Sequence, residues 1–115
     1  MVVYNDEYKF STEGDGTIID LSDRISATVL ESEIRDGHAA VFVPGSTAAV
    51  TTIEYEPGLL SDLPDFFEKI IPSNVKYMHD ETWGDGNGFS HLRAALVGPS
   101  VTIPVSDGKL LTGTW

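Results

Sequence analysis

Hydrophobic residues recur along the chain with two different periods, which predict a mixture of helices and strands. In residues 21–34 apolar side chains recur every third or fourth position, which predicts an amphipathic helix. Ser22 is placed to cap the start of this helix, and Gly37 is placed to end it. Residues 57–71 show the same period and predict a second main helix, which Pro64 is expected to start or kink.

Alternating or wholly apolar segments predict the strands. Residues 2–11 are rich in aromatic and β-branched side chains, and residues 39–43 are almost wholly apolar, as expected of a strand buried on both faces. Residues 48–55 alternate between two faces and predict a third strand. Residues 101–105 and 110–112 flank a turn and predict a terminal hairpin.

The order of these elements and the composition together indicate the fold class and the setting. Strands and helices do not alternate regularly, so we predict an α+β fold with a largely antiparallel sheet in a single domain, residues 1–115. Eighteen acidic and seven basic residues give a net charge of -11, which disfavours nucleic acid and anionic membranes as partners. The chain has no cysteine, no run near the roughly 20 apolar residues that span a bilayer, and no signal-peptide pattern at its start. We therefore expect a cytoplasmic protein without disulfides.

Residues 79–91 are the segment richest in chemistry. They contain two of the three histidines, four carboxylate or amide side chains and three glycines. Imidazole and carboxylate groups bind divalent metals and transfer protons near neutral pH, and glycines let a loop bend sharply. Ser90 is predicted to cap a short helix over residues 91–97, which places His91 where free backbone amides can also hold an anion.

If this loop folds back on itself, His79 and His91 converge on one ion with Asp85 as a third ligand. Two histidines and a carboxylate suit zinc, manganese or iron and leave coordination positions free for water or substrate. Glu54 is the candidate that orients an imidazole, because a charge in an otherwise apolar strand needs a reason. The alternative is that both histidines are structural groups that close a tight loop.

Two further features are candidates for binding phosphate. The turn at residues 44–47 lies between two predicted strands and offers the hydroxyls of Ser46 and Thr47 with flexible backbone amides. It lacks the ending and the spacing of a P-loop, so a simple strand-connecting turn is the alternative. Arg93 is one of only seven basic residues and follows His91 by two positions, so it is a candidate phosphate ligand or a surface ion pair.

The same segments resemble the YjbQ-like family, often labelled secondary thiamine-phosphate synthase. The resemblance covers nearly the whole chain in order. Its matching pieces are Gly37, Val41-Phe42-Val43-Pro44-Gly45-Ser46-Thr47-Ala48-Ala49, Thr52-Ile53-Glu54, His79-Asp80, Asp85-Gly86-Asn87-Gly88, Ser90-His91-Leu92-Arg93-Ala94, Gly98-Pro99-Ser100, Pro104, Asp107-Gly108 and Leu111-Thr112-Gly113-Thr114-Trp115.

The resemblance implies antiparallel sheets packed as a sandwich with two main helices, assembled as a homotrimer with a pocket near the subunit contacts. The implied reaction joins hydroxymethylpyrimidine diphosphate to a thiazole phosphate and releases pyrophosphate. His91, His79 and Glu54 are then the expected catalytic groups, and Asn87 joins the candidate phosphate ligands. A divalent ion would neutralise the leaving diphosphate. Magnesium suits that diphosphate, whereas histidine ligands favour zinc or manganese.

Two departures from the family pattern and three hypotheses follow. Many members carry histidine where this chain has Gly45, which removes one possible ligand or base from the turn. Relatives usually continue beyond Trp115, so we expect an exposed sheet edge or an incomplete subunit interface. The first hypothesis is a metal-assisted enzyme with weak thiamine-phosphate synthase activity. The second is a non-catalytic trimeric protein that binds a metal or a small phosphorylated metabolite. The third is a structural loop that clamps the trimer interface.

Overall fold

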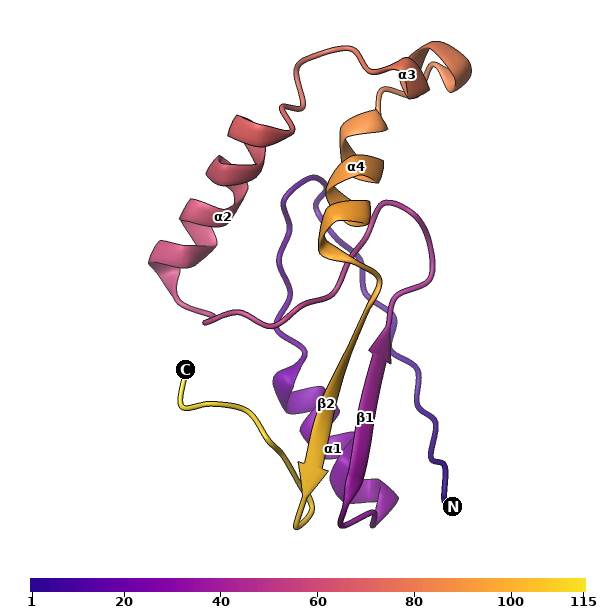
Figure 1. Cartoon of the computed structure of the whole chain (residues 1–115), viewed down its shortest axis with the longest axis vertical. Helices are drawn as coiled ribbons and strands as arrows, with labels where there is room; N and C mark the ends of the chain where they lie inside the picture. The colour runs from indigo at the N-terminus through magenta and orange to yellow at the C-terminus, as the bar shows by residue number, and fades with distance from the viewer. The chain divides into compact units, whose positions relative to one another are not determined.

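The helices and strands of the computed structural model, which describes residues 1–115, form an α+β fold with one antiparallel sheet (Figure 1). In chain order they are α1 (Ser22–Ser32), β1 (Gly37–Phe42), α2 (Pro57–Ile70), α3 (Met78–Trp83), α4 (Gly88–Val97), β2 (Ser100–Ser106) and β3 (Lys109–Leu110). The strand order is β1-β2-β3, and Val105 lies opposite Leu110 in the antiparallel β2–β3 pair. The predicted fold class is confirmed.

The chain divides into two compact units, and the first contains residues Met1–Ala40 and Thr102–Trp115. In this unit α1 packs against β3, and Ile25, Val29 and Val105 are its buried apolar side chains. The predicted terminal hairpin is present. Its turn places Asp107 and Gly108 at φ values of 52° and 75°, the left-handed region that a tight hairpin turn requires.

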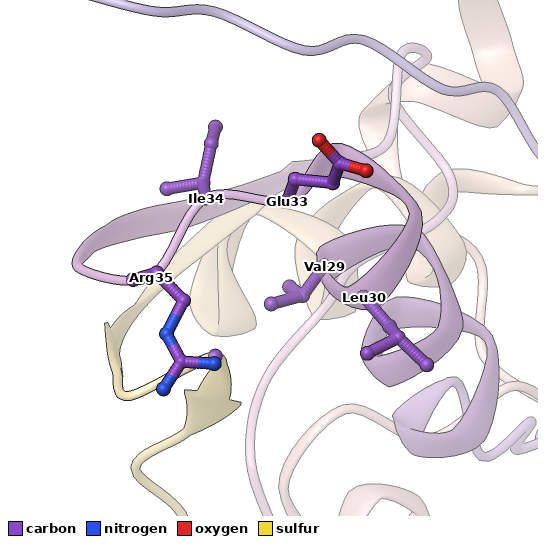
Figure 2. Close-up of a pocket in the computed structure, with 6 residues that line it drawn as sticks. Val29, Leu30, Glu33, Ile34 and Arg35 are labelled. Carbon is purple, nitrogen blue, oxygen red and sulfur yellow. The ribbon is translucent and has the colours of Figure 1, made fainter.

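A pocket of about 320 Å³ lies in the first unit, beside the end of α1 (Figure 2). Its lining residues are Val29, Leu30, Glu33, Ile34, Arg35 and Gly108. The Arg35 guanidinium is paired with the Asp107 carboxylate, and the Arg35 carbonyl accepts the Gly108 N–H at 2.8 Å. The polar groups of Arg35 thus hold the hairpin turn against the end of α1.

The second unit, Val41–Val101, contains three helices and the segment richest in chemistry. Helix α2 begins as predicted, with Pro57 in its first position and the Glu56 carboxylate accepting the N–H groups of Gly58 and Leu59. Helix α3 packs against α4, in which Phe89 and Ala94 are buried. Figure 1 shows that α3 and α4 follow one another through a short loop, residues 84–87.

Helix boundaries differ from the sequence prediction in three places. Helix α1 ends at Ser32, because Glu33 takes the left-handed conformation at φ 59° and stops it before Gly37. Helix α4 begins at Gly88, three residues before the predicted start, and Ser90 is therefore inside it. Helix α3 was not predicted, since six residues are too few to show a helical period.

The predicted strand at residues 2–11 is wrong, because its aromatic side chains dock on α1 instead of entering a ladder. The Tyr8 hydroxyl donates to the Arg24 carbonyl at 3.0 Å, and the Arg24 guanidinium lies 4.9 Å from the centre of the Phe10 ring. Thr28 donates to Asp6 Oδ2 at 2.6 Å. Aromatic and β-branched content therefore reflects side-chain packing at this segment and not strand pairing.

The predicted strand at residues 48–55 is also absent from the sheet. The Val50 N–H donates to the Gly98 carbonyl at 3.1 Å, and the Val43 N–H donates to the Pro99 carbonyl at 2.9 Å. These bonds fix the two ends of the intervening loop to the turn that follows α4.

The longest helix, α2, has 14 residues, and no helix has the length and apolar character that a bilayer crossing requires.

Candidate functional site

Two histidines meet where α3 packs against α4. His79 is the second residue of α3 and His91 the fourth residue of α4, and their ring centres are 4.3 Å apart at an angle of 41°. Both side chains are partly exposed, so solvent and ligands reach them. The glycine-rich loop thus brings the two imidazoles together within one chain.

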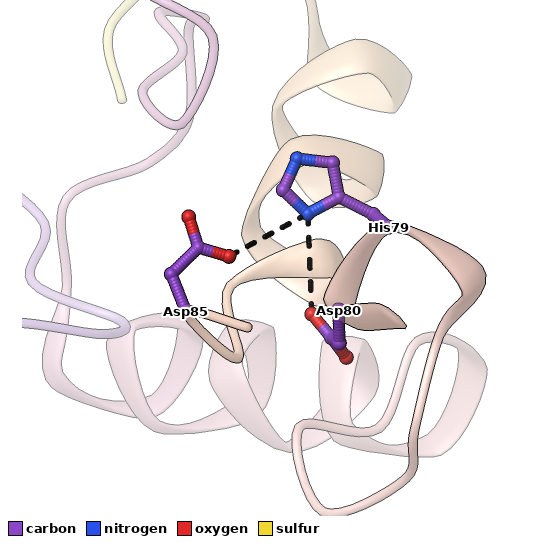
Figure 3. Close-up of side chains that lie close together, drawn as sticks. All are labelled: His79, Asp80 and Asp85. Atoms are coloured by element: carbon purple, nitrogen blue, oxygen red, sulfur yellow. Dashed lines mark ion pairs between the residues drawn. The ribbon is translucent and has the colours of Figure 1, made fainter. Parts of the chain in front are cut away.

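Two carboxylates face the same imidazole (Figure 3). His79 Nδ1 lies 3.9 Å from Asp80 Oδ1 and 3.8 Å from Asp85 Oδ1. One ligand atom from each of these three residues lies within 4.8 Å of the others, a separation that a single divalent ion can bridge. The donor set of one imidazole and two carboxylates suits zinc or manganese better than magnesium.

Asp80 is held in place by the backbone on both sides of the loop. Its carboxylate accepts the Tyr77 N–H at 3.0 Å and the Gly88 N–H at 2.9 Å. These two hydrogen bonds, with smaller contributions from His79 and Lys76, hold the pKa of Asp80 below its usual value. Asp80 is therefore ionised at neutral pH, as a metal ligand must be.

The anion-binding place predicted at the start of the short helix is taken by this protein's own carboxylate. The Gly88 N–H donates to the Asp80 carboxylate, and the N–H groups of Ser90 and His91 donate to the Asn87 carbonyl at 3.0 and 3.3 Å. The first turn of α4 consequently has few free donors for a separate phosphate. The favourable interaction with the helix dipole stabilises Asp80 instead.

Gly88 allows α3 and α4 to approach closely at this point. A Cβ atom built on Gly88 would lie 2.8 Å from the Tyr77 Cβ and 3.0 Å from Asp80 Oδ1, both too close for normal packing. A side chain at this position would force apart the backbone groups that hold Asp80. The need for glycine at this position is steric, and it fixes the distance between His79 and the start of α4.

Asn87 orients the more exposed carboxylate of the cluster. In the amide orientation that satisfies both groups, the Asn87 side-chain nitrogen donates to Asp85 Oδ1 at 2.9 Å and to Oδ2 at 3.3 Å. Asp85 remains 48% exposed, so its oxygens stay available to a ligand. The structure thus gives Asn87 a role beside the cluster, and its predicted contact with phosphate stays a prediction.

Ser46 and Thr47 lie on an exposed loop whose ends are bonded to Gly98 and Pro99, after the last residue of α4. His91 lies seven residues before Gly98, which corresponds to about 10 Å along a helix axis. No hydrogen bond joins either hydroxyl to the histidines. The part of α4 that the loop contacts is thus its C-terminal end, and the predicted phosphate binding by Ser46 and Thr47 stays a prediction.

Glu54 and Arg93 make different contacts from those expected. Glu54 is exposed and its carboxylate makes no hydrogen bond or ion pair, so it orients neither imidazole. Arg93 donates to the Ile71 carbonyl through Nε at 3.1 Å and through Nη2 at 2.8 Å, and Nη2 also donates to Glu68 Oε1 at 2.7 Å. The ion-pair alternative for Arg93 is thus realised, with a side chain only 14% exposed.

Asp80 is the member of the candidate cluster that was not predicted from the sequence. Its signal was its position directly after His79 in a carboxylate-rich segment. Which carboxylate faces the imidazole could not be predicted, because α3 itself was not predicted. Once α3 is known, Asp80 lies in its first turn and close to Gly88.

Comparison with known proteins confirms the family resemblance. The family model described as UPF0047 protein YjbQ-like matches residues 6–115. A UPF0047 protein of Archaeoglobus fulgidus is 44% identical over 98 residues, which cover 85% of this chain and 74% of the relative. A UPF0047 protein of Methanothermobacter thermautotrophicus is 38% identical over 115 residues, covering 100% of this chain and 79% of the relative.

Solved structures show the same fold. A YbjQ-like protein of unknown function from Sulfolobus solfataricus has a TM-score of 0.80 and 33% identity, covering 84% of this chain and 69% of that one. A conserved protein of the yjbq/upf0047 family from Clostridium acetobutylicum has a TM-score of 0.76 and 36% identity, covering 84% of this chain and 73% of that one. The α+β arrangement is therefore shared with experimentally determined relatives.

Proposed function

Because the chain belongs to the YjbQ-like UPF0047 family, we propose that it is a small metal-assisted enzyme with thiamine-phosphate synthase activity. In this reaction the ring nitrogen of a thiazole phosphate attacks the methylene carbon of hydroxymethylpyrimidine diphosphate. One C–N bond forms, one C–O bond breaks, and pyrophosphate leaves. The product is thiamine phosphate, in which the thiazole ring carries a positive charge.

The observation that supports this proposal is the convergence of His79, Asp80 and Asp85 within 4.8 Å beside a second imidazole. These three residues would hold a zinc or manganese ion. When bound, the ion supplies positive charge that counters the negative charge of the leaving diphosphate. Asp80 is already ionised and held by two N–H groups, so part of the site is preorganised.

His91 is the group that we propose for proton transfer. Its ring lies 4.3 Å from that of His79, but it is not one of the three residues whose ligand atoms converge. An imidazole in this position can donate a proton to the leaving diphosphate oxygen, because histidine changes its protonation near neutral pH. The proposal therefore separates an ion-holding group from an acid–base group.

The ion content of the purified protein tests the first part of this division. We expect one zinc or manganese ion per chain in the wild type and a lower affinity for the ion in Asp80→Asn and Asp85→Asn, because each substitution removes a negatively charged ligand. His79→Ala should lose the ion, whereas His91→Ala should keep it. Elemental analysis after purification without added metal, and again after reconstitution, makes the measurement.

His38→Ala is the matched control, because His38 is the remaining histidine and lies exposed on β1. It should bind the ion like the wild type. Loss of the ion in His91→Ala with retention in Asp80→Asn would restore the ligand set predicted from the sequence. Absence of an ion from every reconstituted sample would overturn the metal mechanism and favour a structural loop.

We also propose that the chain forms a homotrimer, which the family resemblance implies and its exposed apolar side chains support. Leu92 and Leu96 lie on one face of α4 and are 47% and 61% exposed. Phe66 and Ile70 form a similar pair on α2, at 50% and 47%. Two such stripes within one unit are typical of surfaces that other subunits cover.

Leu96→Glu tests the assembly, because it places a charge in one of these stripes. Light scattering should give about three times the chain mass of 12.5 kDa for the wild type and a value near one chain mass for the variant. Ala95→Glu, on a different face of the same helix, should leave the mass unchanged. A wild type that is monomeric at all concentrations would contradict the proposed trimer.

One observation favours the non-catalytic alternative. Arg93 is bound to Glu68 and the Ile71 carbonyl, so it supplies no free positive charge to the histidine cluster. A phosphorylated metabolite would then depend on the ion alone, which suffices for binding. Tight binding of thiamine phosphate with no product under any metal would establish this alternative. Both the enzyme and the binding protein are compatible with the cytoplasmic location that we propose.

A further inference from the structure

Asn87 and Gly88 form the only asparagine–glycine pair in the chain, and they lie at the start of α4. In such a pair a backbone nitrogen can attack the asparagine side chain with little hindrance, because glycine has no Cβ atom. Glycine is required here, since a Cβ atom on Gly88 would lie 2.8 Å from the Tyr77 Cβ. The close approach of α3 and α4 therefore places a chemically labile pair in the candidate site.

The reaction that this pair permits is deamidation through a cyclic imide. The Gly88 nitrogen gives its proton to solvent hydroxide and bonds to Asn87 Cγ. The Cγ–Nδ2 bond then breaks, and the leaving nitrogen takes a proton from water and departs as ammonia. A further water molecule opens the imide at either of its carbonyl groups, which leaves aspartate or isoaspartate at position 87.

The folded loop opposes each part of this reaction. The attacking group, the buried Gly88 N–H, donates to Asp80 Oδ1 at 2.9 Å, and this hydrogen bond must break before the nitrogen can attack. The leaving group, the Asn87 amide nitrogen, donates to Asp85 Oδ1 at 2.9 Å. The ψ angle of 16° at Asn87 turns the Gly88 nitrogen away from the Asn87 side chain. Two N–H groups of the first turn of α4 hold the Asn87 carbonyl in this orientation.

We propose that Asn87 is a modification site protected by Asp80, which stays intact while the loop of residues 84–87 is closed and deamidates when that loop opens. The inference is independent of the proposed function, because the hydrogen bonds that protect the amide join groups of the chain itself. The product cannot restore the closed loop. A carboxylate at position 87 has no N–H group for Asp85 and repels it at neutral pH. Isoaspartate also adds a CH₂ group to the backbone just before Gly88.

The rate of deamidation tests the inference directly. The purified full chain is incubated at mildly alkaline pH, and peptide mapping by mass spectrometry follows the modification at Asn87. We expect the folded wild type to react more slowly than the same chain unfolded in urea. Asp80→Ala should raise the rate in the folded protein by about 10- to 100-fold, the rate equivalent of losing a hydrogen bond to a charged acceptor. Asp85→Ala, which frees only the leaving amide, should raise it by less.

The matched control for Asp80→Ala is Glu81→Ala, which removes the neighbouring carboxylate of α3. Glu81 is paired with Lys76 at 3.5 Å, so its loss should leave the rate at Asn87 unchanged. Asn74 is an internal control in every sample. It is more exposed than Asn87, but the β-branched Val75 follows it and hinders attack by the backbone nitrogen, so it should stay intact.

Arg93→Met separates local opening from unfolding of the whole chain. It removes the hydrogen bonds of Arg93 to Glu68 and the Ile71 carbonyl and should lower stability without raising the rate at Asn87. A rate in Arg93→Met as high as in Asp80→Ala would overturn the inference, as would equal rates in the folded and the unfolded wild type. Asp80→Ala and Asp85→Ala both as slow as the wild type would overturn it too. If circular dichroism shows Asp80→Ala to be unfolded, the comparison of Asp85→Ala with Arg93→Met decides.

Discussion

His91→Ala is expected to lower the rate of thiamine phosphate formation by about 100- to 10,000-fold, the usual contribution of a general acid or base. The imidazole lies 4.3 Å from His79 but outside the group of three ion-holding residues, so its loss should leave the ion in place. Product formation measured with saturating substrates and ion gives the rate. Circular dichroism should show an unchanged fold, because His91 is only partly buried.

Two controls separate proton transfer from a structural effect. His38→Ala removes a histidine far from the cluster in sequence and should keep full activity. His91→Gln keeps a polar side chain without an ionisable imidazole and should be as inactive as the alanine variant. Retained turnover in His91→Ala would contradict the proposed role, and a wild type that binds both substrates without forming product would favour the binding protein.

The elements with strong local signals were predictable from the sequence. Helix α2 has its apolar period, with Pro57 at its first turn, and the structure gives it almost the predicted bounds. The positions of strand β1 and the terminal hairpin also follow the prediction, since a short apolar run and a tight turn at Gly108 are local features. The expected burial of β1 on both faces is wrong, because every second residue of the strand is exposed. In these places the residues that determine the structure are neighbours in the sequence.

The candidate site was predictable only in part, because its geometry depends on contacts between separate elements. The richness of residues 79–91 in histidine, carboxylate and glycine indicated the place. Asp80 joins the cluster because its carboxylate accepts the N–H groups of Tyr77 and Gly88. Gly88 is the more distant of these two residues and follows Asp80 by eight positions. A periodic pattern of apolar residues does not indicate hydrogen bonds of this kind, so neither α3 nor the role of Asp80 could be predicted.

The two strand predictions that failed are segments with strand-like composition that pair with no neighbouring strand. At residues 2–11 the Tyr8 and Phe10 rings lie against Arg24 of α1, with ring centres 5.9 and 4.9 Å from the guanidinium carbon, and the Tyr8 hydroxyl donates to the Arg24 carbonyl. Glu54 lost its expected role for the same reason. It was expected to orient an imidazole because it is a charged residue in an otherwise apolar predicted strand, and the structure places it in no strand.

Arg93→Met is expected to lower the free energy of unfolding by about 1–3 kcal/mol, the usual cost of leaving a largely enclosed hydrogen-bonding group without its partner. Methionine preserves much of the side-chain length beside the Phe67 and Phe89 rings, which lie 5.8 and 4.9 Å from the guanidinium carbon. The variant removes both donors to the Ile71 carbonyl. Urea unfolding of wild type and variant makes the measurement.

The same tether gives the stability a dependence on acid pH. Hydrogen bonds from Ser73 and then from Arg93 lower the pKa of Glu68 from 4.5 to about 2. Because the folded pKa is the lower one, this stabilisation is fully present above pH 4.5 and is lost as the pH falls towards 2. Glu68→Gln should therefore flatten the loss of stability between these two pH values, although other carboxylates also contribute to the slope.

A structural tether and a phosphate ligand make opposite predictions for Arg93. As a tether between α4 and the end of α2, Arg93→Met lowers stability and leaves the affinity for thiamine monophosphate of the remaining folded protein nearly unchanged. Arg93→Lys, which can make one of the three hydrogen bonds, should recover part of the stability. Unchanged stability together with a large loss of affinity would instead show that Arg93 leaves Glu68 and binds the phosphate, as the sequence first suggested.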